Sequence, residues 1–256
     1  MKQRLWFFVL LFAILFSSAD ALGQRWKLRR YEASLGVGST HSFMDIGSGL
    51  DGIKAFQLQG TRPNVSFDVR FKIQPEVAVN LALTYAMFGG VDTENRLGMA
   101  HRFTTHAFEP TVRGEYYVIS EGRRYGSSAL FNRRGMINNY NRVYIYGFAG
   151  AGALIWKPTI KDEDGNVVNE GDRPGLNTNL KASPVFPMGI GLKYTIDAHW
   201  TLGFEVGGRL TITDHIDGFS TENSNYNDRY ILTNIKAVYK IRTDRKGRPV
   251  FNRYYR

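Results

Sequence analysis

The stretch "NVSFDVRFKIQPEVAVNLALTYAMF", residues 64–88, decides the fold. Its first part places Val65, Phe67 and Val69 at every second position, with polar or charged residues between them. After Gln74-Pro75 the same alternation resumes. Apolar residues at a period of two predict a β-strand with one apolar and one polar face. We therefore expect two antiparallel strands here, joined by a tight turn.

The same alternation continues through most of the chain. We find eight such segments, near residues 29–38, 63–74, 76–88, 103–119, 143–156, 184–196, 200–213 and 230–241. Strands of this kind form either a soluble sandwich or an outer-membrane barrel whose apolar faces contact lipid. Most segments match or exceed the roughly 9–11 residues that cross a bilayer, and their number is even. The sequence therefore predicts an all-β fold, an eight-stranded antiparallel transmembrane β-barrel of the outer membrane.

Two side-chain patterns favour the barrel over the sandwich. The polar faces combine small residues with charges of both signs, as a lumen filled by ion pairs would. This predicted lumen charge network consists of Asp68, Arg70, Glu109, Arg113, Glu115, Glu205, Arg209 and Lys236. Aromatic residues also gather at the strand ends, as in the girdles of such barrels. We expect one girdle of Tyr116, Tyr144, Tyr194, Trp200 and Tyr239, and a second of Phe88, Phe103, Trp156 and Phe186.

The N-terminus predicts export. A positive start with Lys2 and Arg4 precedes an apolar run, and Ala19-Asp20-Ala21 fits a cleavage site. We expect a signal peptide at 1–21, a barrel domain at 22–242 and a basic periplasmic tail at 243–256. The absence of cysteine excludes disulfides, thiolate metal sites and a lipid-modified cysteine anchor.

With both termini in the periplasm of a Gram-negative bacterium, alternate connections fall outside and inside. The expected external loops are 39–62, 89–102, 157–183 and 214–229. Tight periplasmic turns are expected at Gln74-Pro75 and at Asp197-Ala198-His199, whereas residues 120–142 make an unusually long connection. Pro110 lacks a backbone donor, which predicts a bulge or a position near the rim.

Basic residues are concentrated in the segments assigned to the periplasm. Residues 22–30, 120–142 and 240–256 carry net charges of +4, +4 and +6, within a total of +10 for the whole chain. Contact with anionic lipid headgroups or peptidoglycan would explain such charge, but the interleaved aromatic residues favour a protein-docking surface. The predicted partner surface consists of Arg123, Arg124, Arg133, Arg134, Arg245, Lys246, Arg248, Phe251, Tyr254 and Tyr255. Nucleic acid is a poor partner for an exported barrel.

Catalytic signals are weak. The loop "TDHIDGFST" contains Asp214, His215 and Ser220, which could imitate the acid, base and nucleophile of a lipid hydrolase, and His41-Ser42 is a second candidate pair. No metal-ligand spacing, calcium loop or dinucleotide motif is complete, so we expect no cofactor and no metal. A lipid-modifying hydrolase and a structural barrel without a dedicated partner remain alternatives.

Several segments resemble a known family. The segments "RRYEASLGVGST", "FEPTVRGEYYVI", "YIYGFAGAGALIWKP", "PMGIGLKY" and "FEVGGRLTITDHIDGFST", together with the opening stretch, are similar to the Bacteroidota small outer-membrane barrels that include PorG of the type IX secretion system. His215 replaces a usual Tyr and Gly218 a usual Asp. The resemblance implies a non-enzymatic outer-membrane component that contacts periplasmic secretion-ring proteins.

Overall fold

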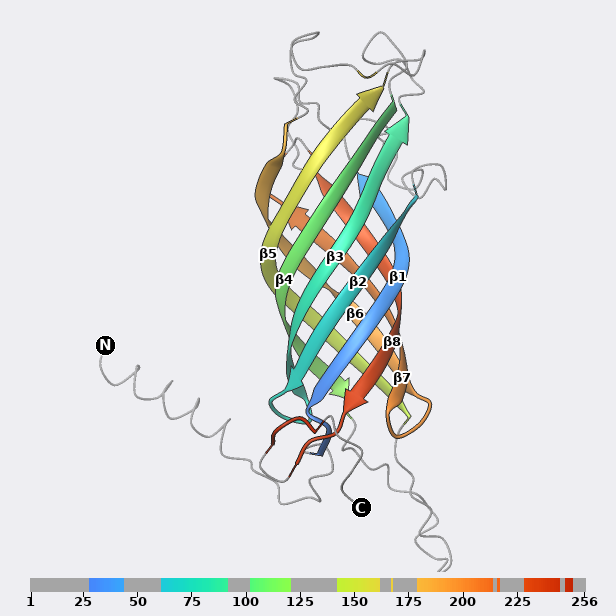
Figure 1. Cartoon of the computed structure of the whole chain (residues 1–256), viewed down its shortest axis with the longest axis vertical. Helices are drawn as coiled ribbons and strands as arrows, with labels where there is room; N and C mark the ends of the chain where they lie inside the picture. Colours follow the sequence, from blue (N-terminus) through green and yellow to red (C-terminus); the bar gives the residue numbers. More distant parts are fainter. Residues whose placement is uncertain are drawn as a thin grey trace, which may run out of the picture.

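The chain forms a closed antiparallel barrel of eight strands (Figure 1). The computed structural model describes residues 28–43, 61–91, 102–120, 142–161, 167, 179–213, 216, 228–244 and 247–250. The strands are β1 (Tyr31–Phe43), β2 (Arg62–Lys72), β3 (Val77–Val91), β4 (Arg102–Ile119), β5 (Val143–Lys161), β6 (Lys181–Thr195), β7 (Trp200–Thr211) and β8 (Arg229–Ile241). Each strand pairs with the next, and β8 pairs with β1 to close the barrel. The predicted fold class is confirmed.

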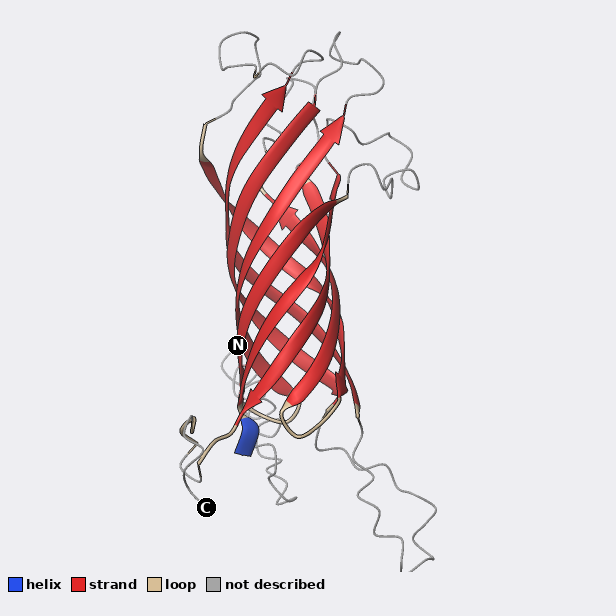
Figure 2. Ribbon diagram, turned by 45° about the vertical axis from the view of Figure 1, so that its right-hand side comes forward, coloured by secondary structure: helices blue, strands red, loops and turns tan. Residues whose placement is uncertain are grey.

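Figure 2 shows an upright cylinder of tilted strands, with a single helical turn near residues 28–29. Among the described residues, none belongs to a helix that is long and apolar enough to span a bilayer. The predicted signal peptide at 1–21 lies outside the described residues.

The two ends of the barrel differ. We call the lower end in Figure 1 the turn end, because it contains the tight connections that follow β2 and β6. There the amide of Ile73 donates to the carbonyl of Val77 at 2.9 Å, and that of Ile196 to Trp200 at 3.0 Å. The first described residue, Leu28, meets the segment after β8 at this end, where Thr243 N donates to the carbonyl of Leu28 at 2.7 Å. The opposite end is the loop end.

The outer surface is a continuous apolar band. Leu35, Val112, Ile190 and Ile235, from four different strands, are 54–67% exposed. Soluble proteins rarely expose apolar patches beyond a few hundred Å². Because every strand is paired on both sides, no backbone edge is left open to a lipid phase. The outer surface therefore suits acyl chains, and the polar residues are on the inside.

Some strands extend beyond the predicted ends. β1 continues to Phe43, β5 continues to Lys161 and β6 begins at Lys181. The loops predicted at 39–62 and 157–183 are therefore shorter than expected. The added residues on the outer face include Ser39, His41 and Lys157, which are more polar than those in the apolar band. Beyond the lipid zone a strand no longer needs an apolar outer face, and the alternation that identified it fades.

The prediction for Pro110 was wrong. It pairs with Leu83 in the middle of the β3–β4 ladder, far from a rim. The β4–β5 register is the same at Phe108↔Ile155 and at Thr111↔Gly152, so no residue is inserted at the proline. The shift lies instead between Tyr117 and Ile119.

The predicted girdles were only partly right. Tyr116, Tyr194, Trp200 and Tyr239 are 41–61% exposed near the turn end. Trp200 packs edge-on against Tyr239 with ring centroids 5.1 Å apart. Phe186 is also exposed, at 41%.

The other four aromatic residues belong inside the barrel. Tyr144, Phe88, Phe103 and Trp156 are at most 5% exposed. Each of them stands at an inward-facing position of its strand, since strand periodicity assigns the face whatever the side chain. Their placement in a girdle is therefore corrected.

Candidate functional site

Charged side chains fill the middle of the barrel. Arg113 on β4 donates to Glu205 on β7 at 2.6 Å and to Asp68 on β2 at 2.9 Å. Lys236 on β8 lies 2.9 Å from Asp68 and 3.0 Å from Glu205. All four side chains are at most 3% exposed. Two cations and two carboxylates thus form a neutral central cluster that ties four strands together.

A second neutral pair lies toward the loop end. Arg209 Nε is 3.5 Å from a carboxylate oxygen of Glu109, and Tyr230 donates its hydroxyl hydrogen to the same carboxylate at 2.5 Å. Arg209 also donates to the carbonyl of Gly207 at 2.6 Å. This pair joins β4, β7 and β8.

The third group, which we call the turn-end cluster, contains Glu32, Arg70, Lys72, Glu115, Lys193 and Lys240. Arg70 donates through Nε and Nη2 to the two carboxylate oxygens of Glu115, at 2.5 and 2.8 Å. Its Nη1 donates to a carboxylate oxygen of Glu32 at 2.9 Å. Lys72 and Lys193 share Glu32, at 2.8 and 2.6 Å.

Small inward residues make room for these side chains. At Gly150 a Cβ would lie 3.0 Å from Cγ of Arg113, and at Gly207 it would lie 2.6 Å from the ring of Phe148. Phe148 itself lies under the guanidinium of Arg113, which is 4.8 Å from the ring centroid. The glycines and alanines of "GFAGAG" thus include inward positions that a larger side chain could not occupy.

The loop end is closed by an apolar cluster. It comprises Ala86, Phe88, Phe103, Ala107, Leu154, Trp156, Ile160, Val185, Ile216, Tyr230 and Leu232. Ile216 comes from the connection after β7 and is fully buried. Its amide donates to the carboxylate of Asp228 at 2.8 Å, and its carbonyl accepts a hydrogen bond from Thr105 at 2.7 Å. The described part of "TDHIDG" therefore inserts an apolar side chain into the barrel mouth, and Asp228 serves as an acceptor there.

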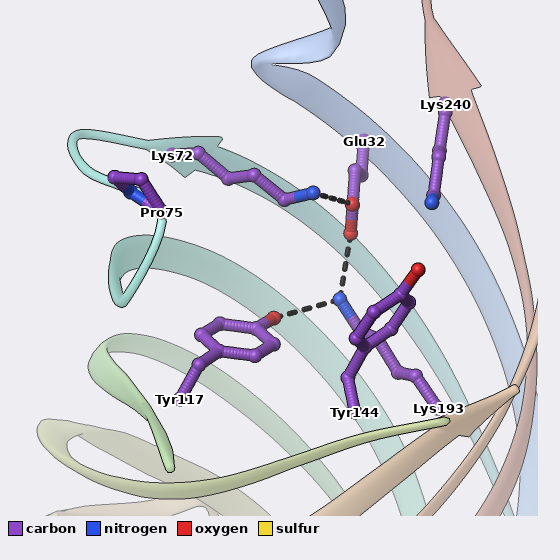
Figure 3. A pocket seen from close by; sticks show the side chains of 7 residues that line it. All are labelled: Glu32, Lys72, Pro75, Tyr117, Tyr144, Lys193 and Lys240. Atoms are coloured by element: carbon purple, nitrogen blue, oxygen red, sulfur yellow. Dashed lines mark hydrogen bonds and ion pairs between the residues drawn. The ribbon is translucent and has the colours of Figure 1, made fainter. Parts of the chain in front are cut away.

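One small cavity lies at the turn end, lined by Glu32, Lys72, Pro75, Tyr117, Tyr144, Lys193 and Lys240 (Figure 3). Its volume of about 10 Å³ holds roughly one water molecule. In the described part of the barrel, the charged clusters and the apolar cluster fill the remaining cross-section with side chains, as expected for eight strands.

The structure places all eight residues of the predicted lumen charge network on the inner face, each at most 2% exposed. Sequence reasoning missed four further members, namely Glu32, Lys72, Lys193 and Lys240. Strand parity could have found all four, since each stands at an inward-facing position. Lys72 and Lys240 also lie at strand ends, where basic residues commonly contact lipid headgroups, so their position alone did not indicate the lumen.

Of the candidate catalytic residues, the structure describes only His41 and Ser42. Asp214, His215 and Ser220 lie outside the described residues. The two ring nitrogens of His41 lie 3.2 Å from the Ser39 hydroxyl and 3.3 Å from that of Thr61. A hydroxyl cannot stabilise an imidazolium as the carboxylate of a triad does. Within the described part of the chain, no three His, Asp or Glu side chains are grouped so as to hold a metal ion.

The predicted partner surface falls largely on residues that the structure does not describe. The residues of this surface that lie outside the described part of the chain are Arg123, Arg124, Arg133, Arg134, Arg245, Lys246, Phe251, Tyr254 and Tyr255. Arg248 is described and exposed at the turn end. It belongs to a small hairpin in which Asp244 N donates to the carbonyl of Arg248 at 2.9 Å and Thr243 pairs with Pro249.

Comparisons with known proteins found one family model and several solved structures. Residues 161–239 match the model of a domain of unknown function, DUF6089. No curated protein matches the sequence. The structure is similar to Ail, the attachment invasion locus protein of Yersinia pestis, at 13% identity and a TM-score of 0.40, covering 82% of this chain and 98% of that one.

Two further solved barrels are similar. Neisserial surface protein A has 8% identity and a TM-score of 0.44, covering 82% of this chain and 96% of that one. Outer membrane protein W of E. coli has 15% identity and a TM-score of 0.38, covering 83% and 98%. At these identities the likeness concerns only the eight-stranded barrel fold.

Proposed function

We propose that this chain is a non-enzymatic outer-membrane component of a protein secretion machinery of the type IX kind, similar to PorG, and that its turn end docks periplasmic secretion-ring proteins. The observation that carries the proposal is the combination of a filled lumen with an exposed basic rim. A barrel that offers no route through its centre acts through its surfaces.

The filled lumen argues against a transport role. The central cluster alone places four charged side chains across the barrel, and they are held by ion pairs of 2.6–3.0 Å. Opening a path would separate buried charges from their partners, which costs about 3–5 kcal/mol for each pair broken.

The rim at the turn end is rich in arginine. Arg142, Arg242 and Arg248 are exposed, and Arg29 and Arg30 are half-buried beside them. Arginine is enriched at protein interfaces, and complementary charge accelerates the encounter with an acidic surface. The basic residues expected in 121–141 and 251–256 would add to this rim. The expected partner, the periplasmic secretion-ring proteins, follows from the resemblance of several segments to the PorG-containing family.

The test is a rim-reversal variant, Arg142→Glu with Arg242→Glu and Arg248→Glu. We expect it to insert into the outer membrane, with normal heat-modifiable migration, while cross-linking to the periplasmic ring proteins and secretion are lost. The matched control, Lys157→Glu with Lys161→Glu, reverses two exposed charges near the loop end and should leave both readouts intact.

Three outcomes would contradict the proposal. Unchanged cross-linking and secretion in the rim-reversal variant would place the interface elsewhere or identify a barrel without a dedicated partner. Failure of insertion would assign the rim to assembly. An altered lipid acyl pattern after Ser39→Ala or His41→Ala would instead identify a hydrolase.

A further inference from the structure

The outer face of β3, β4 and β5 changes character toward the loop end, where these strands reach furthest upward in Figure 1. Tyr85, Phe108 and Ile155 lie side by side on this face and are 37–46% exposed. Two residues nearer the loop end, His106 on β4 and Lys157 on β5 are cross-strand partners, and both are exposed. Apolar groups followed by basic ones complement a lipid, whose acyl chains lead to an anionic headgroup.

Arg62, the first residue of β2, adds a third basic group to the same face. Gly89 follows Tyr85 by four residues and therefore stands on the outward side of β3. A Cβ at Gly89 would lie 2.5 Å from Nε of Arg62 and 3.1 Å from its Nη2. The guanidinium thus covers the outer side of Gly89, in space that only glycine leaves open. Gly89 and His106 are diagonal neighbours on β3 and β4, roughly 7–8 Å apart. Arg62, His106 and Lys157 therefore form one patch, which we call the loop-end patch.

The imidazole of His106 is held in a fixed orientation within this patch. The Tyr85 hydroxyl lies 2.7 Å from Nδ1 of His106, and the two rings stack with centroids 6.1 Å apart. When the phenol donates to Nδ1, Nε2 carries the ring hydrogen and is a donor. A donor that is already oriented loses little conformational entropy when it binds an acceptor.

The acidic side chains that the structure describes lie away from the outer face at the loop end. Six of them are buried inside the barrel, and the other three, Glu76, Asp197 and Asp244, stand at the turn end. In the described part of the chain, the loop end of the outer face therefore carries basic side chains without acidic ones. Complementary charge favours an anionic partner, and the border with the apolar band favours a partner that also carries acyl chains.

We propose that the loop-end patch binds a phosphate group of lipid A, the phosphorylated glycolipid of the outer leaflet. The guanidinium of Arg62 and the ammonium of Lys157 supply charge-assisted hydrogen bonds to the phosphate oxygens. One acyl chain packs on the row of Tyr85, Phe108 and Ile155. The choice of lipid A over a phospholipid rests on the proposed function, which places the turn end in the periplasm and the loop end in the outer leaflet.

The test is native mass spectrometry of the full-length barrel in a neutral detergent with added lipid A. We expect a complex of one lipid A with one barrel, and the complex should be lost when the lipid A is enzymatically dephosphorylated. Arg62→Gln with Lys157→Gln should weaken binding about twenty-fivefold, at about fivefold for each cation. The single variant Lys157→Gln, with about a fivefold loss, serves if the double variant fails to fold.

Arg229→Gln is the matched control. It removes an exposed arginine from the loop end of β8, outside the loop-end patch, and should bind lipid A as the unaltered protein does. Equal binding of dephosphorylated lipid A, or an equal loss in Arg229→Gln and Arg62→Gln with Lys157→Gln, would overturn the inference. Phosphatidylglycerol that binds as tightly as lipid A would overturn the assignment to lipid A.

The two proposals fail separately, because their surfaces lie at opposite ends of the barrel. Lipid A binding is measured on the purified barrel without any secretion partner. The rim-reversal variant should therefore still bind lipid A when its cross-linking to the periplasmic ring proteins is lost. An unaltered protein that cross-links normally but forms no complex with lipid A would refute the lipid site alone.

Discussion

Removal of Arg113 tests the charged interior most directly. In Arg113→Met the aliphatic part of the side chain is replaced at similar volume while the guanidinium is lost. Asp68 and Glu205 then lose contacts of 2.9 and 2.6 Å, and Phe148 loses the cation above its ring. Two carboxylates remain buried with one shared cation, Lys236, which touches both.

The expected loss follows from these contacts. Breaking a buried pair by removing one partner costs about 3–5 kcal/mol, and a desolvated cation–π contact contributes up to about 2 kcal/mol. Because Lys236 still serves both carboxylates, we expect the lower end, a loss of about 3 kcal/mol in the free energy of unfolding. That corresponds to roughly a hundredfold change in the unfolding equilibrium.

The assay is urea unfolding of the refolded barrel in lipid vesicles, followed by tryptophan fluorescence and heat-modifiable migration. Arg142→Met is the matched control, because it removes an exposed arginine just before β5 without touching the lumen. The double variant Arg113→Met with Glu205→Gln should recover part of the lost free energy of unfolding. It removes one of the two buried carboxylate charges that no longer contact Arg113. If Arg113→Met and Arg142→Met differ by less than about 1 kcal/mol, the buried network does not stabilise the barrel as argued.

Three further predictions concern the lumen, its glycines and a turn. The barrel should show no stable conductance in planar bilayers, and a steady large current would show that the lumen is open. Gly207→Ala should destabilise the barrel by about 1–3 kcal/mol, because its Cβ would lie 2.6 Å from the ring of Phe148. Gly208→Ala on the outer face should be neutral, because nothing lies within 4 Å of its Cβ. Equal effects of the two variants in urea unfolding would show that the inner and outer faces are assigned the wrong way round. Hydrogen bonds from the amides of Trp200 and His199 lower the pKa of Asp197, so its contribution is present above about pH 4 and lost as pH falls through the lowered value. The difference in unfolding midpoint between the unaltered protein and Asp197→Ala should therefore vanish at low pH, and a constant difference would contradict this.

Strand periodicity carried most of the fold prediction. In the apolar band, where lipid requires every second residue to be apolar, the alternation identified the strands and separated Val65, Phe67 and Val69 from Ser66 and Asp68. Outside that band the outer face is free to be polar, so the ends of β1, β5 and β6 were missed. The misplaced aromatic residues show the same limit, because position at a strand end does not reveal which face a ring occupies.

The sequence by itself determined which side chains enter the barrel, since parity along a strand assigns each residue to one face. It could not determine which charges meet. Arg113 and Glu205 are 92 residues apart, and their contact depends on the register of every intervening strand and on closure of β8 against β1. The same holds for Lys72, Lys193 and Lys240, which come from three separated strands. Only closure of the barrel brings these three side chains to the lining of one small cavity at the turn end.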